Sequence, residues 1–219
     1  MLALVSGCAG EPPVISRVFA RLTCTRDEAS GRTGETLSVF LVASDPDGIE
    51  DLSAFYVIND EAELFWKVEQ GQWAKATADG ETWIGTNTLS APAGLAMPGG
   101  DYRVVLQDAA GETVEQGFSL PADRPSAAEI PYPRAEVKDG AIVVTGPYEN
   151  PEVRVYGSDG RFRMGFAAGK SAGPLEVKRI AAALPDLGED FTFRVWALDQ
   201  KSTLGVLAGP YASRGLPRQ

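Results

Sequence analysis

The stretch Asp101–Leu120, DYRVVLQDAAGETVEQGFSL, decides the fold class of this chain. Its residues Tyr102, Val104 and Leu106 alternate with polar ones, as in a strand with one buried and one wetter face. Residues 108–111 then form a turn signal that ends in glycine, and the alternation resumes as far as Leu120. The stretch therefore predicts a strand, a tight turn and a returning strand.

A second copy of this pattern lies near the C-terminus, over residues 190–208. Phe191 stands where the first copy has Tyr102, and each copy follows a corner that contains leucine and proline. A tyrosine at such a corner resembles the penultimate strand of immunoglobulin-like and fibronectin type III-like sandwiches. Phe191 lacks the hydroxyl that would bond back to the backbone. The resemblance implies an all-β protein of two tandem immunoglobulin-like β-sandwich domains.

A proline-rich segment predicts the boundary between the two domains. Residues 121–133, PADRPSAAEIPYP, contain four prolines, which cannot donate to a strand ladder and keep the preceding residues extended. We therefore expect a first domain at 14–120, a linker at 121–133 and a second domain at 134–212. Residues 1–13 form an N-terminal segment with a tether, and residues 213–219 a loose tail.

Composition excludes several classes of function. Residues 11–120 carry 7 Lys/Arg against 18 Asp/Glu, whereas residues 127–219 carry 12 against 11. An acidic first domain repels phosphate backbones, so we expect no nucleic-acid partner. The chain has no histidine, which excludes a Ser-His-Asp triad, a Cys-His pair and histidine-bound zinc within it. We expect no cofactor.

The N-terminal residues Val5-Ser6-Gly7-Cys8 resemble the lipobox of bacterial lipoproteins. The resemblance implies a signal peptide cut before Cys8 and acyl chains that attach Cys8 to a membrane of the cell envelope. Only seven residues precede Cys8, and none is Lys or Arg, so a complete signal would begin upstream. The alternative is an ordinary apolar tail with a chance cysteine. Cys24 shares its parity with inward residues of a predicted strand, so we expect a buried thiol rather than a disulfide.

An acidic turn follows the strand predicted around Leu37–Ala43. Ser44-Asp45-Pro46-Asp47-Gly48 resembles the crossing between the sheets of bacterial immunoglobulin-like repeats. Two interpretations stay open here. Asp side chains that bond to their own backbone explain the turn without metal. Alternatively Asp45, Asp47 and Asp51 supply oxygen ligands to calcium, although the spacing falls short of an EF-hand loop.

Tryptophans gather in the first domain, at Trp66, Trp73 and Trp83. Cross-strand aromatic pairs commonly stabilise sheets, and Trp73 is placed to lie across a hairpin from Trp66. Aromatic platforms also stack on sugar rings, so these three residues are candidates for a glycan-binding face.

These observations favour a lipid-anchored envelope protein that acts in binding, adhesion or structural display rather than catalysis. Its partner would be an unidentified protein or glycan, and the alternative is a glycan-binding accessory module. A hydrolase with paired carboxylates is a third hypothesis, which would need two carboxyl groups facing one cleft.

Overall fold

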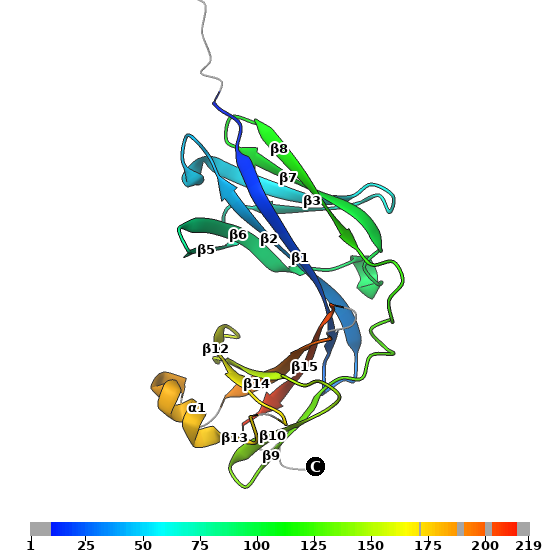
Figure 1. The fold of residues 1–219 in the computed structure, drawn as a ribbon, viewed down its shortest axis with the longest axis vertical. Coiled ribbons are helices and arrows are strands. Elements are labelled where there is room, and N and C mark those ends of the chain that lie inside the picture. The colour runs from blue at the N-terminus through cyan, green and yellow to red at the C-terminus, as the bar shows by residue number, and fades with distance from the viewer. Residues whose placement is uncertain (1–9, 171, 188–190, 200–202, 214–219) are drawn as a thin grey trace, which may run out of the picture. The chain divides into compact units, whose positions relative to one another are not determined.

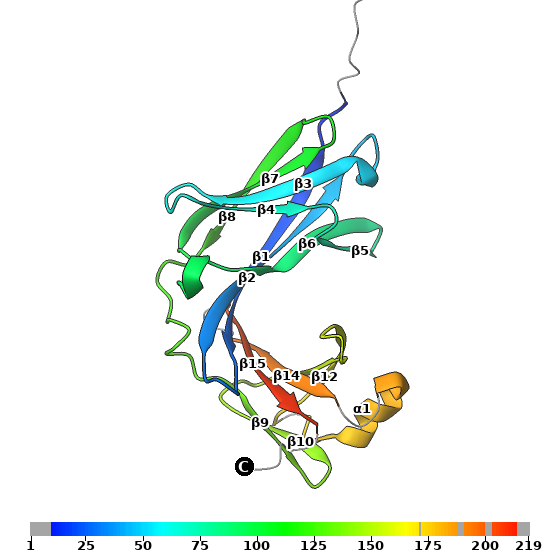
Figure 2. The same ribbon diagram turned by 180° about the vertical axis from the view of Figure 1, so that it is seen from behind.

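The computed structural model describes residues 10–170, 172–187, 191–199 and 203–213. The chain divides into two compact units. The first unit comprises the residues through Ala20, Leu37–Ala91 and Met97–Asp123. The second comprises Arg21–Thr36, Pro92–Ala96 and the residues from Arg124 onward. Strands dominate both units (Figures 1 and 2), which confirms the all-β prediction.

The first unit is a sandwich of two antiparallel sheets. Its strands are β1 (Val14–Arg26), β2 (Thr33–Ser44), β3 (Leu52–Asn59), β4 (Leu64–Glu69), β5 (Ala74–Ala78), β6 (Glu81–Leu89), β7 (Gly100–Asp108) and β8 (Thr113–Leu120). One layer has the order β1-β2-β6-β5 and the other the order β4-β3-β7-β8. These are the two strand orders of an immunoglobulin-like sandwich, with β7 and β8 as its last two strands.

The core of this unit lies between the two layers. Leu41, Phe55, Ile84 and Leu106 each have 0% exposure, and each comes from a different strand. Burying an apolar side chain of this size stabilises the fold by about 1.5–3 kcal/mol. At the corner before β7, the Tyr102 hydroxyl donates a hydrogen bond to the Pro98 carbonyl oxygen at 2.8 Å. The tyrosine corner that the sequence predicted is therefore present.

Strands β1 and β2 contribute residues to both units. The sequence placed all of residues 14–120 in the first domain, but residues 21–36 cluster with the second unit. Thr23–Arg26 of β1 pair in parallel with Gly205–Ala208 of β15 (Gly205–Ala212). Alternation along a strand shows which face is buried, but it does not show which core that face meets.

The second unit also has two layers. Its further elements are β9 (Arg134–Lys138), β10 (Ala141–Thr145), β11 (Glu152–Tyr156), β12 (Phe162–Ala167), β13 (Leu175–Glu176), α1 (Val177–Ala183) and β14 (Thr192–Leu198). Short 3-10 turns occur at Ile49–Asp51 (η1) in the first unit, and at Pro92–Gly94 (η2) and Pro185–Leu187 (η3) in the second. One layer has the order β13-β10-β9, and the other the order β12-β11-β14-β15 extended by β1. Ile180 of α1 packs into the same core as Ile142, Val153 and Phe193.

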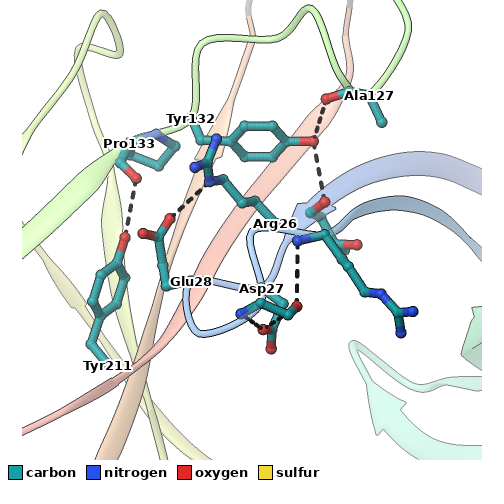
Figure 3. Close-up of polar contacts among 10 residues, drawn as sticks. Arg26, Asp27, Glu28, Ala127, Tyr132, Pro133 and Tyr211 are labelled. Carbon is teal, nitrogen blue, oxygen red and sulfur yellow. Dashed lines mark hydrogen bonds and ion pairs between the residues drawn. The ribbon is translucent and has the colours of Figure 1, made fainter.

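The linker packs onto the second unit instead of running free. Ile130 and Tyr132 are 8% and 9% exposed. The Tyr132 hydroxyl lies 2.8 Å from the Ala127 carbonyl oxygen and 3.2 Å from that of Thr25, and Figure 3 shows this contact beside the loop that carries Asp27. Residues 124–133 are therefore part of this unit's structure. The extended connector expected at 121–133 becomes an anchored segment because its two large side chains are apolar enough to be buried.

Ser213, which the sequence placed at the start of a loose tail, is held in the second unit. Ser213 is 5% exposed, its N–H donates to the Phe191 carbonyl oxygen, and its hydroxyl accepts the Phe191 N–H at 3.0 Å. The rest of the predicted tail, 214–219, lies outside the described residues.

Candidate calcium centre

The loop between β2 and β3 is stabilised by hydrogen bonds that its residue Asp45 accepts. Oδ1 of Asp45 accepts the N–H of Asp47 at 2.8 Å, and the Asp45 carbonyl oxygen accepts the N–H of Gly48 at 3.0 Å. Gly48 has φ of +110°, which a side chain would disfavour. The self-bonded turn that the sequence suggested is therefore formed, and it leaves the second carboxylate oxygen of Asp45 uncommitted.

A second loop contributes Asp108, the last residue of β7. Oδ1 of Asp108 accepts the N–H of Glu112 at 2.7 Å, which closes the turn between β7 and β8. The N–H of Ala109 donates to the Asp51 carbonyl oxygen at 2.8 Å and so joins this turn to the loop after β2. Asp108 is only 2% exposed. The backbone of two loops therefore holds one carboxylate inside the protein.

These loops bring three carboxylates together. One carboxylate oxygen from each of Asp45, Asp51 and Asp108 lies within 4.8 Å of the other two. Oδ2 of Asp45 and Oδ2 of Asp108 are buried and have no hydrogen-bond partner among the described residues. Two full negative charges at this distance repel by about 3 kcal/mol at an effective dielectric constant of 20. Buried charges are normally paired or bound to a metal, so this cluster fits a cation.

The ligand chemistry indicates which cation. All three side chains offer carboxylate oxygens, the ligands that Ca²⁺ and Mg²⁺ take. Mg²⁺ demands near-ideal octahedral geometry, whereas Ca²⁺ accepts 6–8 oxygens in irregular arrangements and includes backbone carbonyls among them. Three carboxylates on irregular loops therefore suit calcium better.

The structure assembles the expected calcium residues only in part. It brings Asp45 and Asp51 together, but the third carboxylate is Asp108 and not Asp47. Sequence reasoning read Asp108 as the first residue of a turn and missed it. The available signal was its parity, because Asp108 continues the buried series Tyr102, Val104 and Leu106. A carboxylate on the inward face of a strand needs a partner.

The three tryptophans are distributed over both layers of the first unit. Trp66 on β4 donates its indole N–H to the Ser90 carbonyl oxygen at 2.9 Å. Trp73 stacks on the buried Phe55 with ring centroids 6.1 Å apart. Trp83 on β6 lies under the guanidinium of Arg17, 5.4 Å from the ring centroid. They do not share one face, and the glycan-binding role stays a prediction.

The expected lipid-attachment residue, Cys8, lies outside the described residues. Within the part of the chain that the structure describes, none of the helices has the length and apolar character needed to cross a bilayer. Cys24 is a free thiol with 0% exposure, which confirms that it faces a core.

Comparisons with known proteins identify no family. No family model matches the chain, and a search of curated proteins finds no match either. Among solved structures, the chain is similar to dimeric latent PorU from Porphyromonas gingivalis, with 14% identity and a TM-score of 0.36 over 92% of this chain. The chain spans 20% of the length of that PorU chain.

A second similar structure is the N-terminal Ig1-2 module of the Drosophila receptor protein tyrosine phosphatase DLAR. It has 12% identity and a TM-score of 0.36, and the match covers 90% of this chain and 98% of the module. We draw nothing about the site from similarities of this size.

Proposed function

We propose that this chain is a non-catalytic binding or display module of a bacterial cell envelope, anchored through acyl chains on Cys8, and that calcium stabilises its first unit. The observation that carries the calcium role is Asp108, whose carboxylate is 2% exposed and keeps one oxygen without a hydrogen-bond partner among the described residues. The anchor is supported by the lipobox-like sequence at Val5–Cys8.

The burial of Asp108 favours cation binding over acid–base catalysis. A glycosidase also needs two nearby carboxyl groups, at about 5–5.5 Å in retaining enzymes, but both must reach a sugar in a cleft. A side chain that is 2% exposed has little access to such a substrate. The absence of histidine from the sequence removes the commonest proton shuttle as well.

The calcium role is tested by thermal unfolding of the full chain in EDTA and in millimolar calcium. We expect calcium to raise the melting temperature of the wild type, because a ligand that binds only the folded state stabilises it. Magnesium at the same concentration should raise it less. No shift with calcium would contradict the proposal.

The variant Asp108→Asn separates a cation ligand from a merely structural aspartate. Asn keeps the Oδ1 that accepts the Glu112 N–H, but it removes the charge. We expect Asp108→Asn to unfold at the same or a higher temperature than the wild type in EDTA, because repulsion is relieved, and at a lower temperature in calcium. A structural role alone would lower both temperatures. The control is Asp79→Asn, an exposed position with φ of +52° that Asn tolerates.

The anchor is tested by phase separation of native material in Triton X-114. We expect the wild type in the detergent phase and Cys8→Ser in the aqueous phase. Native wild-type protein that stays wholly aqueous would contradict the anchor and leave the calcium role unaffected.

A further inference from the structure

Gly10, where the described part of the chain begins, lies beside the acidic cluster of the first unit. A Cβ atom built on Gly10 would lie 2.8 Å from Oδ2 of Asp47, 3.8 Å from Cβ of Ala110 and 3.9 Å from Oδ2 of Asp108. Contacts under 3.0 Å are essentially never made by real Cβ atoms. A side chain at position 10 would therefore meet the Asp47 carboxylate, which is exposed and would have to move aside. The φ of Gly10 is not in the positive region, so its backbone angle does not demand glycine.

Gly10 has no side chain, so it presents only backbone to the cluster. Oδ2 of Asp108 is the same oxygen that has no hydrogen-bond partner among the described residues, and Asp108 is 2% exposed. Calcium takes 6–8 oxygen ligands and commonly includes backbone carbonyls. Three carboxylates leave several of these positions to be filled, and the backbone at Gly10 lies beside the cluster.

We propose that the calcium ion held by Asp45, Asp51 and Asp108 is also bound through the backbone at Gly10, so that the cation fixes residues 10–13 against the first unit. This inference rests on the proposed calcium role of the same site. It makes the N-terminal segment part of the metal centre, and it makes the order of that segment dependent on calcium.

The first test compares Gly10→Val with Gly71→Val. The new side chain at position 10 would meet the Asp47 carboxylate and fill the space between the Gly10 backbone and Oδ2 of Asp108, whereas a Cβ at Gly71 meets nothing within 4 Å and Gly71 also has no positive φ. By calorimetric titration with calcium we expect Gly10→Val to weaken binding by about tenfold, since affinity depends on ligand number and on the rigidity of the site. Gly71→Val should bind as the wild type does.

The second test measures the motion of the N-terminal segment with a spin label. A nitroxide label is attached to Cys8 of the unlipidated full chain, and Cys24, with 0% exposure, is expected to stay unlabelled. We expect calcium to slow the label's motion in the wild type and in Gly71→Val, and to leave it unchanged in Gly10→Val.

The two tests keep this inference distinct from the calcium role itself. A wild type that binds calcium while Gly10→Val retains full affinity and the label's motion never changes would overturn the N-terminal contact alone. A wild type that does not bind calcium would overturn both.

Discussion

Among the described residues, each unit buries one carboxylate, and the charged groups around the two carboxylates differ. In the second unit, the side chains of Glu35 and Arg124 are 3% and 7% exposed, and Nη2 of Arg124 lies 3.1 Å from Oε2 of Glu35. In the first unit, Asp108 is equally buried but is joined to no Lys or Arg by an ion pair among the described residues. Its nearest charged neighbours in the cluster are two further carboxylates.

Under the proposed calcium role, the two units compensate a buried carboxylate in different ways. Taking a charge out of water costs several kcal/mol unless a partner compensates for it. The second unit supplies a cation from its own sequence, Arg124, at the start of the anchored linker. The cluster of the first unit brings three carboxylates together, so we expect its compensation to come from a bound ion. We therefore expect the stability of the first unit, but not that of the second, to depend on the calcium concentration.

The largest expected effect comes from breaking the buried ion pair between Arg124 and Glu35. Arg124→Met removes this ion pair while Glu35 stays buried, and breaking a buried ion pair typically costs about 3–5 kcal/mol. We expect urea unfolding to detect this loss equally in EDTA and in calcium. The double variant Arg124→Met with Glu35→Leu should recover much of it. A single variant as stable as the wild type would show that the pair contributes little.

A smaller effect is expected from weakening calcium binding at the carboxylate cluster of the first unit. Asp51→Asn removes one charge from the cluster and should reduce calcium affinity by about tenfold, or about 1.4 kcal/mol. The control is Asp199→Asn, which removes one carboxylate charge from the second unit, directly after β14. Calorimetry should find calcium binding unchanged in Asp199→Asn. Equal losses in both variants would mean that calcium acts through net charge and not at this site.

The tyrosine corner gives a third comparison. Tyr102→Phe makes the first unit resemble the second, which has Phe191 at this position, and it removes the hydrogen bond to the Pro98 carbonyl oxygen. A hydrogen bond of this kind contributes about 1 kcal/mol net. We expect a loss of that size in the unfolding free energy, with calcium affinity unchanged. Phe191→Tyr serves as the reciprocal control and should not stabilise the protein by a similar amount.

The smallest effect concerns Cys24. Burial, with a further contribution from Glu35, raises the pKa of this thiol to about 11, against the nearby Arg124, which lowers it. In a Cys8→Ser background we expect almost no reaction with a thiol reagent at pH 8 until the protein unfolds. Because the unfolded thiol ionises first, stability from this group is complete below pH 9 and is lost as the pH rises toward 11. Fast reaction of native protein would contradict this burial.

The sequence was sufficient for most of the local structure. The alternation of Tyr102, Val104 and Leu106 predicted β7, and the corner proline predicted the bond that Tyr102 makes. These features depend on residues close together in the chain. The side-chain period of a strand and the chemistry of a turn can be read over a few positions.

The sequence was insufficient wherever distant segments meet. Residues 21–36 look like the continuation of two strands of the first domain, and only the pairing of Thr23–Arg26 with Gly205–Ala208 assigns them to the second unit. Asp45 and Asp108 are 63 positions apart, and each has a local turn that explains it fully. The cation hypothesis depends on the carboxylate oxygens that these turns do not use, and only the folded structure shows that these oxygens lie close together.

The position of Gly10 has a consequence for distance from the membrane. Under the two proposals above, residues 9–12 are a tether between Cys8 and the buried Pro13, and four extended residues reach about 14 Å. Once calcium holds Gly10, Ala9 alone separates the acylated residue from the folded body, a reach of about 3.5 Å. The distance between the first unit and the lipid surface would then depend on the calcium concentration outside the membrane. It would be shorter at high calcium and longer at low calcium.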